Sequence, residues 1–417
     1  MAASSPTAGG SVGSAIAAPL SWHTGWGGWD AALDQQTPPA RRSPYRPDVH
    51  VVATVGHRPP GRPPASTRSG RGSARSVRGV ADCRCRYDDG GERMAVWVAR
   101  HRLLVALSVL VVVIVAGLRV ASIAAARSCA DTPPAEAFVT VDGVALHHVD
   151  RGAGHPVVLL HGDGGSVLDL TMSPAVDRLA ERHRVIVIDR PGHGHSDPAR
   201  EVGSLREQAS LVRGAVRQLG LEDPVLVGHS RGATVMAAYL DAFADEVAAA
   251  VSLGGDLLGN PDPGDYGAYR PVSWPVLGPA VVDVFYAPAV RAGDHRLLRD
   301  GLDRAFAPEG PAPDDYVAAY ACRWVSVDAL EATYRLMEDT GVVMPEVRRG
   351  YSDVTVPVLI VHGSADGNVP LADAVEAHQL LPTSELRVLD GAGHELQFTR
   401  PDDVIRAIDD AVSLTRR

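Results

Sequence analysis

The sequence predicts an α/β fold with a mostly parallel, doubly wound sheet, and three observations support this prediction. Short apolar runs alternate with helix-length amphipathic segments through the last two thirds of the chain. Several of these runs are apolar throughout, as expected of parallel strands that helices cover on both faces. A single insert rich in Pro and aromatic residues interrupts the alternation. We therefore expect one layered core with a helical cap over one edge of its sheet.

The first 93 residues differ in composition from the rest of the chain. They are rich in Pro, Gly, Ser and Arg and have no apolar periodicity. Such a segment buries too little apolar surface to offset its chain entropy, so we expect a disordered tail over residues 1–93. Met94 precedes basic residues, an apolar run and small residues, which is typical of a natural start. The alternative that the tail is an upstream extension of the gene model therefore stays open.

Charge and cysteine usage exclude several kinds of site. The tail is basic while the whole chain carries a net charge of −10, so the remainder is acidic and a poor nucleic-acid binder. Every basic residue is Arg, which excludes a lysine nucleophile. Cys83 and Cys85 lack the spacing and the second pair of a zinc site. Cys129 and Cys322 remain as a pair that an oxidising compartment would allow to bond.

Residues 94–127 are predicted to form a membrane segment. The stretch 103–118 carries no charge, and it reaches the roughly 20 residues of a spanning helix if Arg102 or Arg119 snorkels. More arginines precede this stretch than follow it, so the positive-inside rule puts the N-terminus in the cytoplasm and the remainder outside. The alternative is a signal peptide cleaved near Ala126, which would release a secreted protein.

After a linker over 128–136, the α/β core is predicted in two pieces, 137–255 and 351–417, with a helical cap over 256–350 after the sixth strand. The first two strands are close together and suit an antiparallel hairpin. The aromatic residues of the cap are expected to form its own core and, in part, to line an apolar pocket. The predicted strands are 138–141, 146–149, 157–161, 185–189, 225–227, 248–253, 358–362 and 386–389. The predicted helices are 174–181, 205–219, 233–243, 371–380 and 401–414 in the core, and 295–306 and 315–337 in the cap.

Ser230 is the candidate nucleophile. It lies in a Gly-x-Ser-x-Gly pattern between a predicted strand and a predicted helix, which places it on a tight turn at the carboxyl edge of the sheet. Gly228 and Gly232 leave room for the backbones to approach, and the helix N-terminus favours developing negative charge. The same pattern at residues 9–13 has neither strand nor helix beside it. Context therefore selects Ser230.

A serine hydroxyl is a weak nucleophile without a base, and two later loops offer the partners. His394 lies in a glycine-rich loop after the last predicted strand, and Asp366 follows the strand before it. Asp256 also follows a strand and is the alternative acid. The order Ser230, Asp366, His394 resembles the triad of α/β-hydrolases, and the chain from about residue 136 to 417 resembles such a hydrolase with a helical cap.

A fourth motif is similar to the oxyanion loop of that superfamily. His161, Gly162, Asp163 and Gly164 follow a predicted strand in the pattern His-Gly-x-Gly. By this resemblance, the backbone N–H groups of Asp163 and Arg231 would hold the oxyanion, and Asp163 would contribute only its backbone. The sequence assigns no role to the Arg231 side chain.

A turn over residues 189–197 resembles another turn of the superfamily. His193 and His195 within it invite a metal interpretation, but no Cys or carboxylate cluster supports one, so we expect turn residues and no metal.

The resemblance implies a serine hydrolase that cleaves a carboxylic ester of a small, apolar acyl substrate through an acyl-enzyme, without a cofactor. Ser at the nucleophile position counts against epoxide hydrolases and haloalkane dehalogenases, which use Asp there. A cofactor-free perhydrolase, a lactonase, an amidase and a carbon–carbon bond hydrolase remain open on the same triad, as does a catalytically silent binding protein. The natural substrate, its acyl length and the oligomeric state are open as well.

Overall fold

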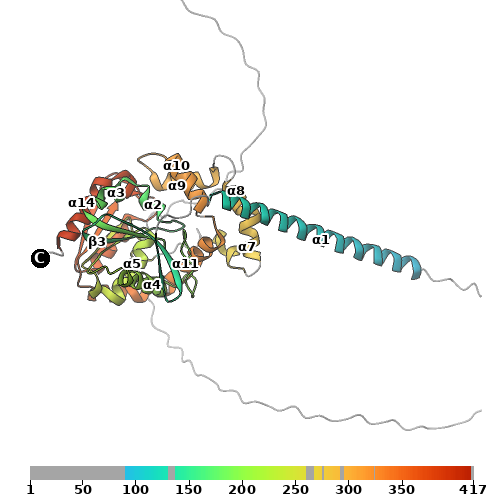
Figure 1. Ribbon diagram of the computed structural model, residues 1–417, viewed down its shortest axis with the longest axis horizontal. Coiled ribbons are helices and arrows are strands. Elements are labelled where there is room, and N and C mark those ends of the chain that lie inside the picture. Colours follow the sequence, from blue (N-terminus) through green and yellow to red (C-terminus); the bar gives the residue numbers. More distant parts are fainter. Residues whose placement is uncertain are drawn as a thin grey trace, which may run out of the picture. The chain divides into compact units, whose positions relative to one another are not determined.

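The computed structural model describes residues 90–129, 137–259, 267–274, 277–291, 295–323 and 325–414. The predicted tail over 1–93 falls almost wholly on residues 1–89, and the predicted linker mostly on 130–136, so both lie outside the described residues. Figure 1 shows helices arranged around a central sheet in the described part of the chain.

The described sheet has eight strands in the order β1-β2-β4-β3-β5-β6-β7-β8. β1 and β2 pair antiparallel, as do β2 and β4, and the other neighbours pair parallel. The predicted mostly parallel sheet and its opening hairpin are thus confirmed. The strands are β1 (Phe138–Val141), β2 (Val144–Arg151), β3 (His155–Leu160), β4 (His183–Ile188), β5 (Val225–His229), β6 (Ala249–Leu253), β7 (Val358–Gly363) and β8 (Ser384–Leu389).

Successive residues of the central strands face two different hydrophobic cores. In β3, Leu159 packs into the core under one layer of helices and Leu160 into the core under the other. This explains why the strands are apolar throughout. The first layer contains α2 (Leu168–Thr171), α3 (Pro174–Ala180) and α14 (Pro401–Leu414); the second contains α4 (Leu205–Gln218), α5 (Arg231–Phe243) and α12 (Leu371–Leu380).

The alternation is interrupted where the cap was expected, between β6 and β7. One prediction there was wrong: the helix expected over 315–337 is two helices, α10 (Asp314–Arg323) and α11 (Val327–Val347). The hydroxyl of Ser326 accepts the Ala329 N–H at 3.0 Å and so begins a new helix, which runs on to Val347. The described elements are η2 (Gly267–Ser273), α7 (Leu277–Val281), η3 (Val282–Tyr286), α8 (Ala287–Arg291), α9 (Arg296–Phe306), α10 (Asp314–Arg323), α11 (Val327–Val347) and η4 (Arg348–Asp353).

The insert between β6 and β7 contains a small hydrophobic cluster, against which Met172 and Phe398 from outside the insert also pack. Phe306 and Tyr316 are buried in it beside Leu298 and Leu302, and the rings of Phe306 and Tyr316 lie 5.6 Å apart. Phe306 and Tyr316 therefore stabilise the insert, with Tyr286 and Tyr320 packed against them as partly buried residues. Phe285, by contrast, is 70% exposed.

The predicted membrane segment lies within one helix, α1 (Gly90–Cys129). Its part Arg93–Val120 is 28 residues long and contains an 18-residue stretch with a mean hydropathy of 2.8, and by length and composition it is able to cross a membrane. None of this 18-residue stretch is buried against the rest of the described chain. This is what a lipid-facing helix requires, although a signal sequence has the same properties.

Candidate active site

Ser230 lies on the turn between β5 and α5, in a backbone conformation that L-residues rarely adopt. Its φ is 52° and its ψ is −123°. The turn is held on both sides: the Ser230 N–H donates to the Leu253 carbonyl at 3.1 Å, and the Ser230 carbonyl accepts from Ala233 at 3.0 Å and from Asp256 at 3.2 Å. Such strain persists only where surrounding contacts enforce it, and it is common where a side chain does chemistry.

The flanking glycines allow the close approach that the elbow needs. A Cβ at Gly228 would overlap the backbone of Ala233, and a Cβ at Gly232 would overlap the Leu160 carbonyl oxygen of β3. A Cβ at Gly162 would lie 3.4 Å from Ser230 Oγ. The predicted oxyanion loop therefore passes directly beside the candidate nucleophile.

The structure brings His394 and Asp366 together. His394 follows β8, and its Nδ1 lies 2.8 Å from Asp366 Oδ2, which follows β7. The other carboxylate oxygen of Asp366 accepts the backbone N–H groups of Asn368 and Val369 at 2.8 and 2.9 Å. Both side chains are buried, with 3% and 0% of their surface exposed. The carboxylate is thus fixed in place and aimed at the imidazole.

Burial and charge act against each other in this pair. Burial lowers the pKa of His394, but the charge and hydrogen bond of Asp366 outweigh it and raise that pKa above its usual value. Burial likewise raises the pKa of the Asp366 carboxyl, while His394 and the backbone donors lower it further than burial raises it. Asp366 is therefore ionised at neutral pH and stabilises a protonated His394.

The alternative acid, Asp256, is engaged elsewhere. Its carboxylate accepts a hydrogen bond from the Arg231 guanidinium, and its second oxygen accepts the Gly259 N–H at 2.6 Å. Asp366 is the carboxylate that contacts His394 within the described residues. Among those residues the Ser230 hydroxyl has no hydrogen-bond partner, and catalytic hydrogen bonds often tighten only when substrate binds.

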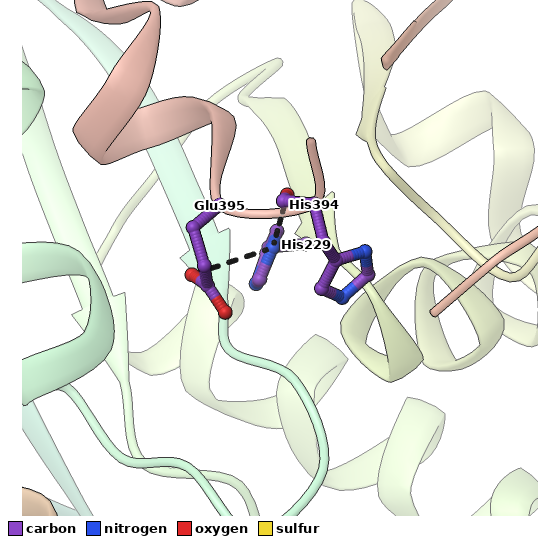
Figure 2. Close-up of side chains that lie close together, drawn as sticks. All are labelled: His229, His394 and Glu395. Carbon is purple, nitrogen blue, oxygen red and sulfur yellow. Dashed lines mark hydrogen bonds and ion pairs between the residues drawn. The ribbon is translucent and has the colours of Figure 1, made fainter. Parts of the chain in front are cut away.

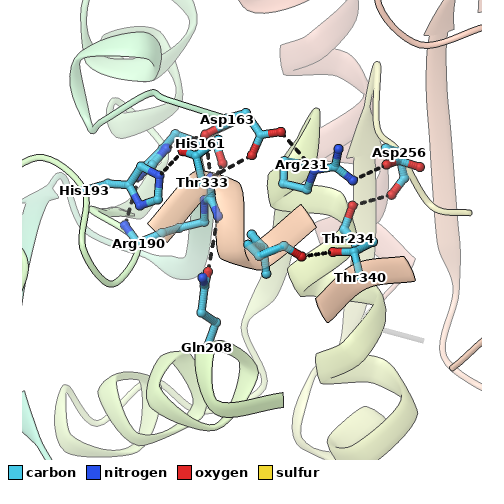
Figure 3. A network of polar contacts seen from close by, with 12 residues as sticks. His161, Asp163, Arg190, His193, Gln208, Arg231, Thr234, Asp256, Thr333 and Thr340 are labelled. Carbon is cyan, nitrogen blue, oxygen red and sulfur yellow. Dashed lines mark hydrogen bonds and ion pairs between the residues drawn. The ribbon is translucent and has the colours of Figure 1, made fainter. Parts of the chain in front are cut away.

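A buried arginine that no sequence motif revealed supports the predicted oxyanion loop. Arg190 has no exposed surface, and it donates to the carbonyls of His161 at 3.0 Å and Gly162 at 2.7 Å and to Gln208 at 3.2 Å (Figure 3). Burial lowers the pKa of Arg190 to about 10, so it remains charged at neutral pH. The motif Asp-Arg-Pro-Gly was visible in the sequence, but nothing local indicated that its arginine turns inward.

His161 completes this support as a neutral residue. Its Nε2 accepts the backbone N–H of Arg190 at 2.9 Å, so its Nδ1 carries the proton and donates to the Gly162 carbonyl at 2.9 Å. Burial, with the charge of Arg190, holds the pKa of His161 well below its usual range. Two donors therefore converge on the Gly162 carbonyl.

One group of three buried side chains in the described part of the chain has the spacing of metal ligands: His229, His394 and Glu395, with ligand atoms within 4.8 Å of one another (Figure 2). His229 Nε2 lies 3.3 Å from the His394 carbonyl oxygen, which can only accept, so this nitrogen carries a proton and offers no lone pair. The Glu395 carboxylate accepts from Gln397 at 2.6 Å. We interpret the group as support for the His394 loop.

The predicted turn residues His193 and His195 lie after β4. His193 is buried, and its Nε2 contacts the Thr333 hydroxyl at 3.1 Å. Burial, together with Arg190, lowers the pKa of His193 to about 3. The backbone N–H of His195 donates to Asp189 at 2.9 Å. Both residues thus take part in hydrogen bonds that hold the turn.

The sheet order, the strained elbow and the paired His and Asp after the last strands define the class of α/β hydrolases. The model of the alpha/beta hydrolase fold family matches residues 155–401, so the chain belongs to this family. This confirms the resemblance drawn from the motifs.

The proteins to which this chain is similar have names that describe different reactions. The chain is 28% identical over 278 residues to the dihydrolipoyllysine-residue acetyltransferase component of an acetoin cleaving system from Cupriavidus necator, covering 66% of this chain and 68% of that protein. It is 27% identical over 287 residues to 2-hydroxy-6-oxo-2,4-heptadienoate hydrolase from Pseudomonas putida, covering 66% and 94%. A malate-bound thermophilic esterase from Thermogutta terrifontis has a TM-score of 0.52 at 21% identity, covering 68% and 98%, and shows the fold alone.

Proposed function

We propose that the protein is a serine hydrolase that cleaves a carboxylic ester through an acyl-enzyme. The observation that carries the proposal is the strained turn that presents Ser230 at the sheet edge where the His394–Asp366 pair lies, at 2.8 Å. Three separate loops meet there, and a merely structural turn would not require this strain.

In the first half of the reaction, Ser230 Oγ attacks the ester carbonyl and His394 Nε2 takes its proton. The oxyanion accepts hydrogen bonds from the backbone N–H groups of Asp163 and Arg231. His394 then gives the proton to the leaving alcohol as the ester carbon–oxygen bond breaks, which leaves the acyl group on Ser230. Asp366 keeps the imidazole in the required tautomer and stabilises its protonated form.

In the second half, His394 takes a proton from water, and the hydroxide equivalent attacks the acyl carbonyl. Collapse of the second oxyanion breaks the bond to Ser230 Oγ, returns the proton to Ser230 and releases the acid. Apart from the substrate and water, the steps use only side chains and backbone N–H groups of this chain, so we propose no cofactor and no metal.

A second candidate is a carbon–carbon bond hydrolase on the same residues. It is favoured by the relative from Pseudomonas putida, whose name describes hydrolysis of an oxo-dienoate and of which the chain covers 94%. Both candidates require a nucleophile or base at Ser230 and His394. They differ in the substrate that fits beneath the cap.

A fluorophosphonate probe tests the shared mechanism. We expect covalent label on Ser230 of the full chain, loss of the label in Ser230→Ala, and retention in the control Ser210→Ala on the exposed face of α4. A panel of p-nitrophenyl esters of increasing acyl length, with an oxo-dienoate in parallel, then separates the two candidates. Label elsewhere, or turnover unchanged in Ser230→Ala, would contradict the proposal.

We also propose that α1 anchors the protein in a membrane. Its arginines are more numerous before the apolar stretch than after it, which places the N-terminus in the cytoplasm and the hydrolase domain outside. Cleavage near Ala126 with secretion remains the alternative. In either case, the hydrolase domain would bind its substrate outside the cytoplasm.

A further inference from the structure

The Arg231 side chain, to which the sequence assigned no role, is buried between two carboxylates. Its exposed fraction is 6%. Nε donates to Asp163 Oδ2 at 3.0 Å, and a terminal nitrogen donates to the Asp256 carboxylate (Figure 3). The backbone N–H of Asp256 in turn donates to the Ser230 carbonyl at 3.2 Å. One guanidinium therefore links the oxyanion loop, the elbow and the chain that follows β6.

Asp163 is held at further points. A terminal nitrogen of Arg190 lies 3.7 Å from Asp163 Oδ1, and the Asp163 carbonyl accepts the Tyr320 hydroxyl of α10 at 3.1 Å. The backbone N–H of Asp163, by contrast, has no hydrogen-bond partner among the described residues. A rigidly held residue thus keeps one donor available.

The preceding peptide plane sets the direction of that donor. In a planar trans peptide, the carbonyl of Gly162 and the N–H of Asp163 point in opposite directions. Arg190 and His161 both donate to the Gly162 carbonyl. The Asp163 N–H must therefore point away from Arg190, and rotating the peptide would break both hydrogen bonds and leave a buried guanidinium poorly paired.

We propose that Arg231 and Arg190 are positioning residues that hold the Asp163 N–H in place as an oxyanion donor. Arg231 acts through the carboxylate of Asp163, and Arg190 acts through the carbonyl of Gly162. Arg231 thus contributes its own backbone N–H as one oxyanion donor, and its side chain fixes the second donor, the Asp163 N–H. The carboxylates of Asp163 and Asp256 balance the charge of the Arg231 guanidinium. The Arg231 side chain therefore acts by fixing the geometry of the Asp163 N–H and not by its charge. The inference rests on the acyl-transfer reaction proposed above.

A double-mutant cycle on the full chain tests the link between Arg231 and Asp163. We expect Arg231→Met and Asp163→Ala each to lower kcat by about 10- to 100-fold, less than the loss of a whole oxyanion donor, with KM within about threefold. The double variant is expected to lose no more than the worse single variant, because both remove the same contact. Affinity for a boronic acid transition-state analogue should fall by the same factor as kcat/KM.

The matched control is Arg213→Met on α4, which removes a guanidinium paired with Glu246 away from the site and should leave kcat unchanged. Asp163→Asn keeps the side-chain shape and is the second variant if Asp163→Ala does not fold, as judged by thermal unfolding. Unchanged kcat in folded Arg231→Met, or multiplicative losses in the double variant, would overturn the positioning role. Failure of the wild type to hydrolyse any ester would instead overturn the proposed function.

Discussion

At the scale of single residues, the protonation of His394 is the property on which the proposed chemistry depends most directly. The imidazole accepts a proton from Ser230 only when it is neutral. Asp366 raises the pKa of His394 above its usual value despite burial. We therefore expect the acidic limb of the pH–activity profile to reflect this pair, with His394 and Asp366 titrating together.

We expect kcat/KM to rise with pH through a midpoint above about 6.5, the usual His value, because the base is protonated and inactive below its raised pKa. In Asp366→Asn the carboxylate that raises this pKa is gone, so the midpoint should move to lower pH and kcat should fall by roughly 10⁴-fold. A pH–rate profile of both proteins measures this.

The control for this experiment is Asp390→Asn, which removes a carboxylate from the loop after β8 without contact to His394. Its midpoint should match that of the wild type. If the midpoint does not move in Asp366→Asn, the acidic limb of the pH–rate profile reports the titration of another group.

At the scale of secondary structure elements, the elbow depends on how closely α5 approaches β3. Gly232 in the first turn of α5 lies against the Leu160 carbonyl, which leaves no room for a Cβ. The predicted helix began two residues later than α5 does, because the pattern of small residues does not show where the strained turn ends.

Gly232→Ala should destabilise the fold by about 2 kcal/mol or more, since the methyl group overlaps backbone that cannot rotate away. Gly301 in α9 offers a matched comparison, because a Cβ there meets nothing within 4 Å. Gly301→Ala should stabilise the protein by about 0.5–1 kcal/mol through helix propensity. Urea unfolding of the two variants gives both values, and equal effects would contradict this account of the elbow.

At the scale of the whole molecule, the proposed anchor determines where the reaction occurs. The uncharged stretch 103–118 is about 24 Å long at 1.5 Å per residue, and the 28-residue segment Arg93–Val120, which includes four arginines, is about 42 Å long, against roughly 30 Å for a bilayer core. Spanning therefore requires Arg102 or Arg119 to snorkel toward the membrane surface.

In cells, we expect the full chain to stay with membranes after carbonate extraction and to enter the soluble fraction only with detergent. Protease added from outside should digest the hydrolase domain while the membrane is intact. Leu110→Arg together with Ile114→Arg should prevent membrane retention, because charges near the bilayer centre are costly. The paired control Leu110→Ala with Ile114→Ala should remain bound, and a mature protein that begins after Ala126 would instead support cleavage.

The sequence alone determined the strand order along the chain and the triad candidates, because both depend on local patterns. Apolar runs specify buried strands, and Ser230, Asp366 and His394 each lie in a short motif after one of them. It did not show the break at Ser326: serine is favoured at helix starts but also occurs inside helices, so one serine does not fix a boundary.

What only the tertiary structure decided is how charges far apart in the sequence neutralise one another. Arg190, Arg231, Asp163 and Asp256 look like ordinary loop residues, and each would be costly to bury alone. Arg190, Arg231 and Asp256 are buried and Asp163 is half-buried, because the sheet brings the segments after β3, β4, β5 and β6 to one edge, where each charge meets its partners. Pairing at that distance has no local signal, so it follows from the fold and not from any motif.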